Sequence, residues 1–221
     1  MKRRSRTVSA SVRAFTLVEV LVVVAIIGIL ASLSVAGLRI AQIHAREGAV
    51  KHEISLLKAA AETFGREMGD FPPSRWSFFR VSGVNAENDG NEILLLCLLS
   101  RKKGGPFHED FEEDRLLNAD GDTLPPAALA VVRKELDPSR TSGALFEYTD
   151  AWGNPYVYIH HRDYGQKLTY RTAEGTKFEV EAAKSPTGEG HAAPSSFQIW
   201  SLGPDGVNQN GEGDDICSWK S

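Results

Sequence analysis

Oxygen-bearing side chains gather at short spacing near the C-terminus, in the stretch Ser201 to Trp219. Four glycines separate them, and glycines let a chain wrap closely around a bound ion. Calcium takes about six to eight oxygen ligands, whereas magnesium demands a tighter octahedral site and keeps its waters. The stretch therefore predicts either a calcium loop or a solvated acidic turn, with the side-chain candidates Asp205, Asn208, Asn210, Glu212, Asp214 and Asp215.

Two other groups contain residue types that bind metals. The segment Asn118 to Asp122 has the short acidic spacing of a calcium loop, but it lacks the distal bidentate acid of an EF-hand. We therefore expect an exposed turn there. His160, His161 and Asp163 follow a candidate strand, and adjacent strand residues point to opposite faces of a sheet. We therefore expect no shared transition-metal site at these histidines.

Other chemistry has little support in the sequence. It contains no glycine-rich phosphate loop, no Gly-x-Ser-x-Gly and no paired-histidine zinc motif, so we predict that the protein is not an enzyme. The formal net charge of −4 gives no indication of nucleic-acid binding, which needs a basic face. Cys97 and Cys217 permit a disulfide in an exported domain without demanding one.

Regular elements must position the acidic loop, and the first is a long helix. Apolar residues recur at mostly alternating steps of three and four, the spacing of an amphipathic helix. Gly69 and the two prolines at 72 and 73 end this pattern. We predict one helix from Thr16 to about Arg66, whose apolar stripe contains Ile43, Val50, Ile54, Leu57, Ala61, Phe64 and Met68.

Shorter elements follow the helix. The apolar run Asn91 to Ser100 predicts a buried helix and Ala127 to Leu136 another, with a surface loop from Arg101 to Pro126 between them. After Gly143, turns alternate with runs of β-branched and aromatic residues, which indicate strands. A small antiparallel sheet packed on the apolar face of the long helix gives an α+β fold. The predicted strands lie in Tyr156 to His161, after a turn at Trp152 to Pro155, and in Lys167 to Thr172, Lys177 to Ala183 and Phe197 to Gly203.

The N-terminus is first basic and then apolar. Five of the 25 basic residues and no acidic residue lie in Met1 to Ala14, which leaves a balance of −9 for the rest of the chain. The uncharged run Val20 to Leu38 has 19 residues, or about 28 Å of helix, enough to cross a hydrocarbon core. By the positive-inside rule the basic head stays in the cytoplasm. Glu19 precedes this run, where a carboxylate is costly unless it is paired, neutralised or within reach of water.

The order Ala14-Phe15-Thr16-Leu17-Val18-Glu19 resembles the processing site of type IV prepilins and type II secretion pseudopilins. The resemblance implies that a prepilin peptidase cuts after Ala14 and methylates the new amine of Phe15. Ala14 replaces the usual glycine, and Ala36 stands where many members have a helix-kinking proline. After cleavage, the amine of a neighbouring subunit could pair with Glu19 and set the assembly register. The alternative is that Glu19 is merely solvated in the headgroup region.

The C-terminal half resembles the major pseudopilins of type II secretion. The stretches Asp150 to Tyr156, Ser201 to Gly206 and Asp214 to Trp219 are similar to their Trp-Gly-Asn-Pro-Tyr turn, their Ser-x-Gly-x-Asp-Gly turn and their Asp-rich end. The resemblance implies a structural calcium in this end loop. Its ligands by position would be the Leu202 carbonyl and the carboxylates of Asp205, Asp214 and Asp215.

The resemblances imply a pilin-like organisation and a pseudopilin function. The expected parts are a leader (1–14), a transmembrane or filament-core helix half (15–38), an amphipathic half (39–68) and a periplasmic α+β domain (69–221) with the calcium-type loop 201–219. The subunit would polymerise through its helix to drive protein export across the outer membrane. It would lie in the inner membrane as a single-pass protein, with its N-terminus in the cytoplasm. The implied partners are other copies of the chain, prepilin peptidase, an inner-membrane assembly platform with its ATPase, and minor pseudopilins.

Two further functions stay open. Residues 81–149 and 167–194 are not covered by the resemblance and are expected to be outward-facing insertions, which leaves room for a pilin-like subunit of a related machine. Alternatively, the chain could be a monomeric, membrane-tethered binding module of the periplasm, which is a different class of protein. In that case the inserted middle region would hold a substrate or wall polymer.

Overall fold

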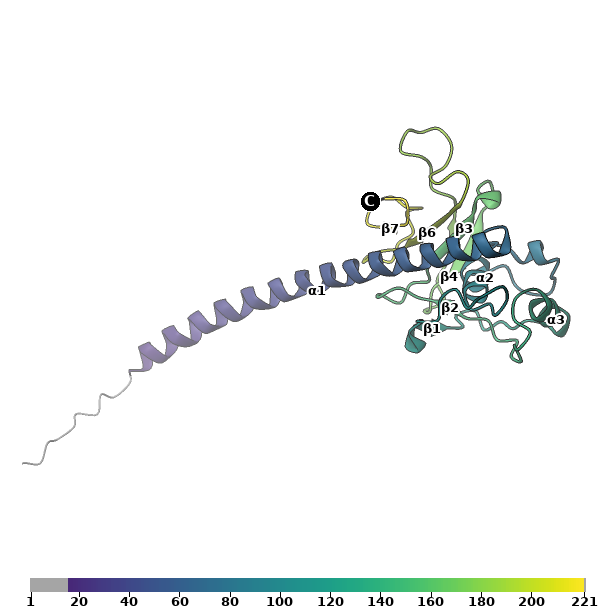
Figure 1. Cartoon of the computed structure of the whole chain (residues 1–221). Helices are drawn as coiled ribbons and strands as arrows, with labels where there is room; N and C mark the ends of the chain where they lie inside the picture. The colour runs from purple at the N-terminus through teal and green to yellow at the C-terminus, as the bar shows by residue number, and fades with distance from the viewer. Residues whose placement is uncertain (1–15, 221) are drawn as a thin grey trace, which may run out of the picture. The chain divides into compact units, whose positions relative to one another are not determined.

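The long N-terminal helix predicted from the sequence is present in the computed structural model, which describes residues 16–220 and only the backbone of residues 33–37. Helix α1 spans Leu17–Met68 (Figure 1). The chain divides into two compact units, Met1–His44 and Ala45–Ser221. The predicted helix from Thr16 to about Arg66 is therefore confirmed to within two residues at its end.

A membrane span was predicted over Val20 to Leu38. Among the described residues, no helix combines the length and the apolarity that a membrane crossing requires. The side chains of residues 33–37, which belong to the predicted span, lie outside the described part of the chain.

The second unit contains two more α-helices and seven short strands within the described residues. The helices are α2 (Asp89–Leu98) and α3 (Pro126–Glu135), close to the predicted positions. Single 3-10 turns lie at Trp76–Phe79, Glu113–Arg115 and His161–Asp163. The strands are β1 (Leu116–Leu117), β2 (Glu147–Tyr148), β3 (Val157–His160), β4 (Leu168–Arg171), β5 (Lys177–Val180), β6 (Phe197–Ser201) and β7 (Ile216–Cys217).

The fold is α+β, as predicted, but the described strands form three small antiparallel sheets instead of one: β1–β2, β3–β6–β7 and β4–β5. In the central sheet, Tyr158 of β3 lies opposite Ile199 of β6. The β4–β5 pair closes through a short turn, in which the Thr172 amide donates to the Thr176 carbonyl at 3.0 Å. The other edge of β4 is bonded to the segment before α2, where the Asn88 amide donates to the Thr169 carbonyl at 2.9 Å. The predicted α+β fold is therefore confirmed, with its strands divided among three small sheets.

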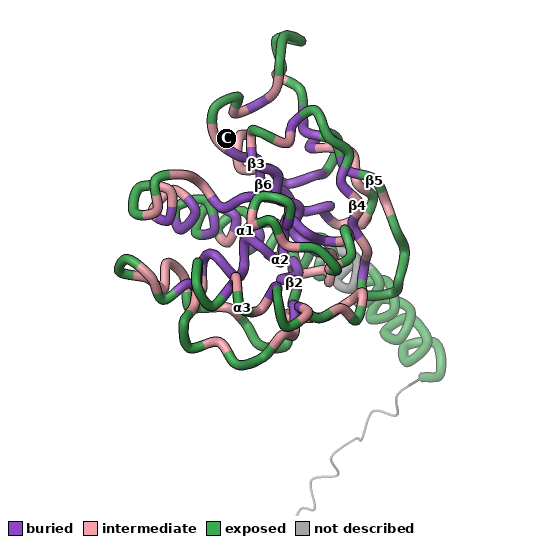
Figure 2. The backbone as a smooth tube through the Cα atoms, turned by 90° about the vertical axis from the view of Figure 1, so that its right-hand side faces the viewer, coloured by how far each residue is buried: buried purple, intermediate pink, exposed green. Residues whose placement is uncertain are grey.

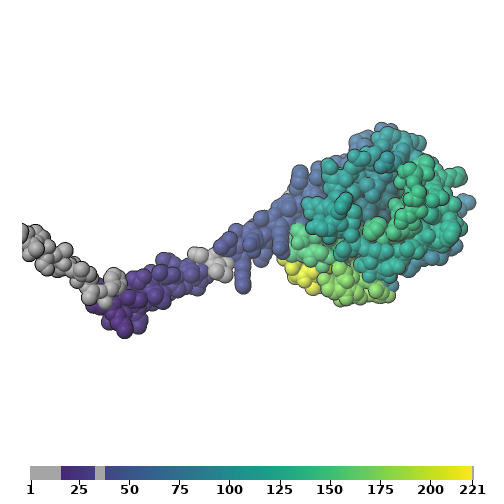
Figure 3. All heavy atoms as spheres, turned by 90° about the horizontal axis from the view of Figure 1, so that it is seen from below, coloured from purple at the N-terminus to yellow at the C-terminus, as the bar shows by residue number. Residues whose placement is uncertain are grey.

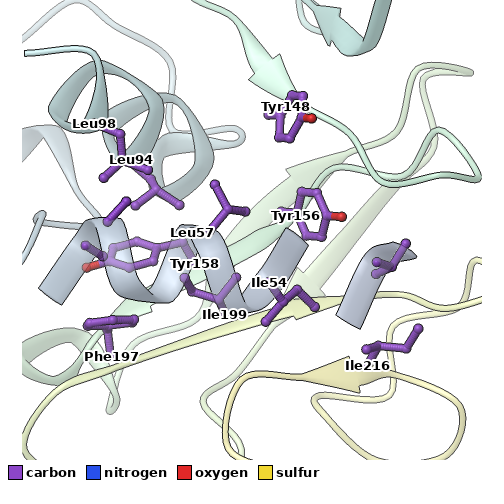
Figure 4. Packing of buried hydrophobic residues seen from close by; sticks show 13 residues of the cluster. Ile54, Leu57, Leu94, Leu98, Tyr148, Tyr156, Tyr158, Phe197, Ile199 and Ile216 are labelled. Carbon is purple, nitrogen blue, oxygen red and sulfur yellow. The ribbon is translucent and has the colours of Figure 1, made fainter. Parts of the chain in front are cut away.

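The core of the second unit lies where α1 meets the central sheet and α2. Ile54 and Leu57 of α1 pack in one cluster with Tyr158 and Ile199 (Figure 4). All residues of α2 are buried, and buried backbone is concentrated around α2, β3 and β6 (Figure 2). Of the predicted apolar stripe, the residues buried in this unit are Val50, Ile54, Leu57, Ala61 and Phe64, whereas Met68 is half-buried and Ile43, in the first unit, is 42% exposed.

A polar contact also holds α1 to the rest of the second unit. Glu53 accepts hydrogen bonds from Arg115 Nη2, at 2.5 Å, and from the hydroxyls of Tyr148 and Tyr156. The Arg115 guanidinium lies 4.6 Å from the centroid of the Tyr148 ring, a cation–π distance. Residues 81–149 were expected to face outward apart from the predicted buried helix, but Arg115 and Tyr148 of this segment also contact Glu53 of α1.

Candidate functional site

The N-terminal motif forms the start of α1. Glu19 Oε2 accepts the Thr16 amide at 2.9 Å and the Thr16 hydroxyl at 2.8 Å, while Thr16 Oγ1 accepts the Glu19 amide at 3.3 Å. This reciprocal arrangement is a capping box, which satisfies amides that the first helical turn leaves without partners. Sequence reasoning missed it, although Thr-x-x-Glu at 16–19 was a sufficient signal. The predicted processing residues, Ala14 and Phe15, lie outside the described residues.

The first half of α1 exposes apolar side chains on every face. Four consecutive residues, Val20 to Val23, are each about half exposed or more, and consecutive helical residues point in different directions. A helix that is apolar all round is normally covered by lipid or by other protein. The large apolar residues exposed in this half are Leu17, Val18, Val20, Leu21, Val22, Val23, Val24, Ile26, Ile27, Ile29, Leu30, Leu38 and Ile40.

The turn before β3 is organised around Asp150, which is fully buried. Its Oδ1 accepts the amides of Trp152 and Asn154, both at 2.9 Å. Its Oδ2 accepts the hydroxyl of Ser201 at 2.5 Å, and Ser201 Oγ in turn accepts the amide of Gly203 at 3.1 Å. Asp150 thereby connects the Trp-Gly-Asn-Pro turn of the C-terminal half to the acidic loop that follows β6.

Removing this carboxylate should destabilise the domain. In Asp150→Ala, two amides and one hydroxyl in a buried site lose their acceptor, and each unsatisfied buried group costs about 1–3 kcal/mol where water cannot replace the partner. We expect a loss of about 2–3 kcal/mol in the free energy of unfolding, measured by urea denaturation. Ser201→Ala, which leaves the two Asp150 amide contacts in place, should cost less. Equal midpoints for Asp150→Ala and the wild type would contradict this assignment.

The acidic loop after β6 lies on the surface of the second unit, among the yellow residues of Figure 3. Gly203 has a φ of +69°, and a Cβ at this position would lie 2.4 Å from the Asp214 carbonyl oxygen. The two ends of the loop are therefore in main-chain contact, which only glycine permits. Asp214 Oδ2 also accepts the amide of Asp205 at 3.2 Å. The Asp214 carboxylate thus contacts the backbone of Asp205, while the Asp205 carboxylate accepts the Val207 amide at 2.7 Å and the Gln209 side-chain amide at 3.3 Å.

Asp215, the third predicted carboxylate, is buried and directed toward a different part of the loop. Its Oδ2 accepts the amides of Gln209, at 3.1 Å, and Gly211, at 2.7 Å. Its Oδ1 is buried without a hydrogen-bond partner. Burial raises the pKa of Asp215 to about 6, against the opposing effect of the two amides. An unpaired buried carboxylate oxygen is the kind of atom that a cation would satisfy.

The remaining predicted ligands hold the loop to its surroundings. Leu202 is fully buried. Asn208 Oδ1 accepts the indole N–H of Trp200 at 3.1 Å, and Asn210 Oδ1 accepts the amide of Glu181 at 2.9 Å. Glu212 is exposed and lies 3.9 Å from Lys220 Nζ. The amide side chains therefore fix the loop against β6 and the end of β5, which leaves the carboxylates as its candidate ion ligands.

In the part of the chain that the structure describes, no three acidic, histidine or cysteine side chains of this loop gather within 4.8 Å; the group that does is Glu92, Asp120 and Asp122. The loop therefore has suitable oxygen donors and flexible glycines, but its three carboxylates are not arranged around one point. Calcium binding would require the loop to close around the ion.

The histidine pair has a geometry that sequence reasoning did not foresee. Because β3 ends at His160 and a 3-10 turn starts at His161, the two rings lie 4.3 Å apart instead of on opposite faces. They make separate contacts: His160 Nε2 lies 3.3 Å from Asp70 Oδ1, and His161 Nδ1 lies 3.0 Å from the Ser196 carbonyl. Asp163 accepts the hydroxyl of Ser74 at 2.6 Å.

The two cysteines are free and buried in different parts of the core. Cys97 packs in the cluster formed by Phe64, Trp76 and Ile93, while Cys217 packs in the cluster around Trp200. The disulfide that the sequence permitted is therefore not formed in this structure.

Comparison with known proteins gives one family match. The family model described as the prokaryotic N-terminal methylation motif matches residues 9–35, the segment that contains the predicted cleavage position and Glu19. No curated protein and no solved structure matches the chain. The motif supports a type IV pilin-like or pseudopilin subunit, a class of structural proteins that prepilin peptidase processes and that assemble into filaments. It also fits anchoring in a membrane.

Proposed function

We propose that this protein is a structural pseudopilin of a type II secretion pseudopilus, anchored in the inner membrane with its α+β domain in the periplasm. The observation that carries the proposal is the methylation motif at residues 9–35, which overlaps the helix half whose apolar side chains are exposed on every face. Such a surface needs lipid before assembly and neighbouring subunits after it. One helix can meet both needs without any change of fold.

In the proposed mechanism the chain polymerises and catalyses nothing. Processing after Ala14 creates an amine at Phe15, and Glu19 pairs with the amine of a neighbouring subunit to set the register. The exposed apolar half of α1 then forms the filament core, while the Ala45–Ser221 unit lies outside it. Energy for assembly comes from a partner ATPase through the inner-membrane platform, and minor pseudopilins are the other expected partners.

The mature N-terminus provides the direct test of this function. We expect mass spectrometry of the chain, purified from cells that contain a prepilin peptidase, to find an N-methylated Phe15 and no residue before it. The same chain from cells without the peptidase should retain residues 1–14. An unprocessed chain in both strains would favour the membrane-tethered monomer over the pseudopilin. A processed chain that forms surface fibres instead of supporting secretion would favour a related pilin machine.

We also propose that the acidic loop binds a structural calcium through Asp205, Asp214, Asp215 and the Leu202 carbonyl. Support comes from the buried, unpaired Oδ1 of Asp215 and from the all-oxygen donor set. When bound, calcium would neutralise the carboxylates and hold the two ends of the loop together.

Metal removal should therefore lower the stability of the domain. An ion present at about 100 times its Kd contributes about 2.7 kcal/mol, so we expect chelator to lower the thermal midpoint by about 5–10 °C. The variant Asp214→Asn should lose part of this sensitivity, and Glu212→Gln, an exposed neighbour, should keep it. If Asp214→Asn and the wild type respond equally to chelator, the ion does not bind in this loop.

A further inference from the structure

A second cluster of acidic side chains lies away from the C-terminal loop, between α2 and the segment after β1. Glu92 comes from α2, whereas Asp120 and Asp122 come from the turn Asn118 to Asp122. Carboxylate oxygens of these three residues lie within 4.8 Å of one another. Two oxygens that bind one calcium ion at about 2.4 Å can be separated by at most about 4.8 Å, so the spacing permits all three residues to bind one ion.

Glu92 is an unusual residue to find in this position, because it is 1% exposed and lies on a helix that is buried along its whole length. Its Oε2 accepts the indole N–H of Trp76 at 3.3 Å. Its Oε1 is buried and has no hydrogen-bond partner. Buried polar atoms are nearly always paired. A bound cation would satisfy this carboxylate oxygen, which lies near two further carboxylates.

Asp122, a second member of the cluster, has the same deficit, as does the neighbouring Asp89. Four of the six buried side-chain atoms without a partner in residues 16–220 belong to Asp89, Glu92 and Asp122, and both oxygens of Asp122 are among them. Asp120 is better satisfied, since its Oδ2 accepts the Asn85 amide group at 2.8 Å and its Oδ1 accepts the Asp122 amide at 3.3 Å. The free acceptor capacity therefore points into the space between Glu92 and Asp122.

The turn itself is held in a shape that presents its oxygens. Asn118 Oδ1 accepts the Asp122 amide at 3.1 Å, and Asn118 Nδ2 donates to the Asp122 carbonyl at 2.9 Å. Gly121 has a φ of +74°, which allows the turn to double back. Nearby, Glu147 is buried and accepts the Ala119 amide at 2.9 Å. These contacts leave the Asp122 carboxylate available.

The electrostatic environment contains excess negative charge. Burial raises the pKa of Glu92, and the neighbouring acids Asp122, Glu147, Asp120 and Asp89 raise it further. Burial likewise raises the pKa of Asp122, with Asp120 and Glu147 adding to the effect and the adjacent Glu92 side chain opposing it. Of the nearby cations, Arg75 lowers the pKa of Asp89 through its positive charge. Arg171 and Lys177 form ion pairs with Glu87 at the edge of the cluster. A bound cation would offset this repulsion.

We propose that Glu92, Asp120 and Asp122 form a second metal site, which binds a calcium ion between α2 and the Asn118–Asp122 turn. The donor set is made of carboxylate oxygens, which suits a hard cation. The acid that an EF-hand places after its loop is supplied here by a helix that precedes the loop in the chain. This site does not depend on pseudopilin assembly or on the C-terminal loop.

The test uses the full chain in detergent, freed of metal with chelator, in a background with Asp214→Asn and Asp215→Asn to disable the C-terminal loop. We expect added calcium to raise the thermal midpoint by about 5–10 °C at 100 times its Kd. Glu92→Gln and Asp122→Asn, which keep side-chain size, should lose this rise. Asp114→Asn, an exposed matched control in the same connecting segment, should keep it.

A second measurement reports on the site itself. Terbium takes the oxygen ligands of calcium and luminesces when a nearby indole is excited, and Trp76 contacts Glu92 directly. We expect terbium luminescence that calcium displaces and that Trp76→Phe or Glu92→Gln abolishes. Absence of any calcium effect in the background chain would overturn the proposal, as would an equal midpoint rise in Glu92→Gln and Asp114→Asn. If low pH raised the thermal midpoint and calcium did not, the carboxyl groups would share a proton instead of a metal ion, and the proposal would be overturned.

Discussion

Glu19→Gln should abolish filament assembly while leaving the start of α1 intact. Glutamine can replace glutamate at the third position of a capping box, so the contacts with Thr16 survive. It cannot pair with a cationic amine. Removing one partner of an ion pair that assembly buries costs about 3–5 kcal/mol, more than a hundredfold in the association constant between subunits. Multimers trapped by chemical crosslinking in membranes should therefore fall to background.

The capping contact in the structure makes a matched control available. Thr16→Ala removes the cap, at about 1 kcal/mol, but keeps the charge of Glu19. We expect this variant to be processed and to assemble with a modest loss. If Thr16→Ala fails to assemble and Glu19→Gln assembles normally, Glu19 acts through the helix start and the register hypothesis fails. The comparison requires that both variants are cleaved normally after Ala14, which mass spectrometry of the N-terminus can verify.

Gly90→Ala should be among the most destabilising single substitutions in the domain. Gly90 lies in the first turn of α2, and a Cβ there would lie 2.2 Å from the carbonyl oxygen of Tyr158 and 2.5 Å from the hydroxyl of Tyr170. The first of these atoms is backbone in β3, so the helix and the sheet must separate. We expect a loss of about 3 kcal/mol or more, or roughly 6–12 °C in the thermal midpoint.

Gly48→Ala is the matched control, because Gly48 is also helical but a Cβ added there would have no atom within 4 Å. Alanine is the better helix former by about 0.5–1 kcal/mol, so this variant should be unchanged or slightly more stable. The two substitutions therefore have opposite expected signs. A similar midpoint for both would mean that α2 does not pack against β3 as described.

Much of the fold could be predicted from local patterns. The three- and four-residue spacing of apolar residues identified α1, because it reflects which face of a helix is buried. Runs of β-branched and aromatic residues between turns identified β3 to β6, of which β3 and β6 are buried at every residue. The pair β1–β2 and strand β7 were missed. Each has two residues, too few for any period to emerge, and their pairing depends on distant partners.

The candidate sites were harder to predict than the fold. The acidic spacing of Asn118 to Asp122 was visible, but its missing ligand, Glu92, lies upstream inside an apolar run where a carboxylate looks incidental. No local motif shows that Glu92 lies near Asp120 and Asp122, because only the packing of α2 against the turn brings these residues together. The capping role of Glu19 is the reverse case, because its whole signal lies within four residues.

The contact between Glu53 and Arg115 has a practical consequence for anyone who shortens this protein. The segment 81–149 has the sequence character of an appendage that could be trimmed for expression or crystallisation. Yet Arg115 and Tyr148 from that segment hold a carboxylate of the long helix. A deletion that removed them would leave Glu53 beside Tyr156 without its cation. The segment should therefore be treated as part of the scaffold, and any truncation should begin elsewhere.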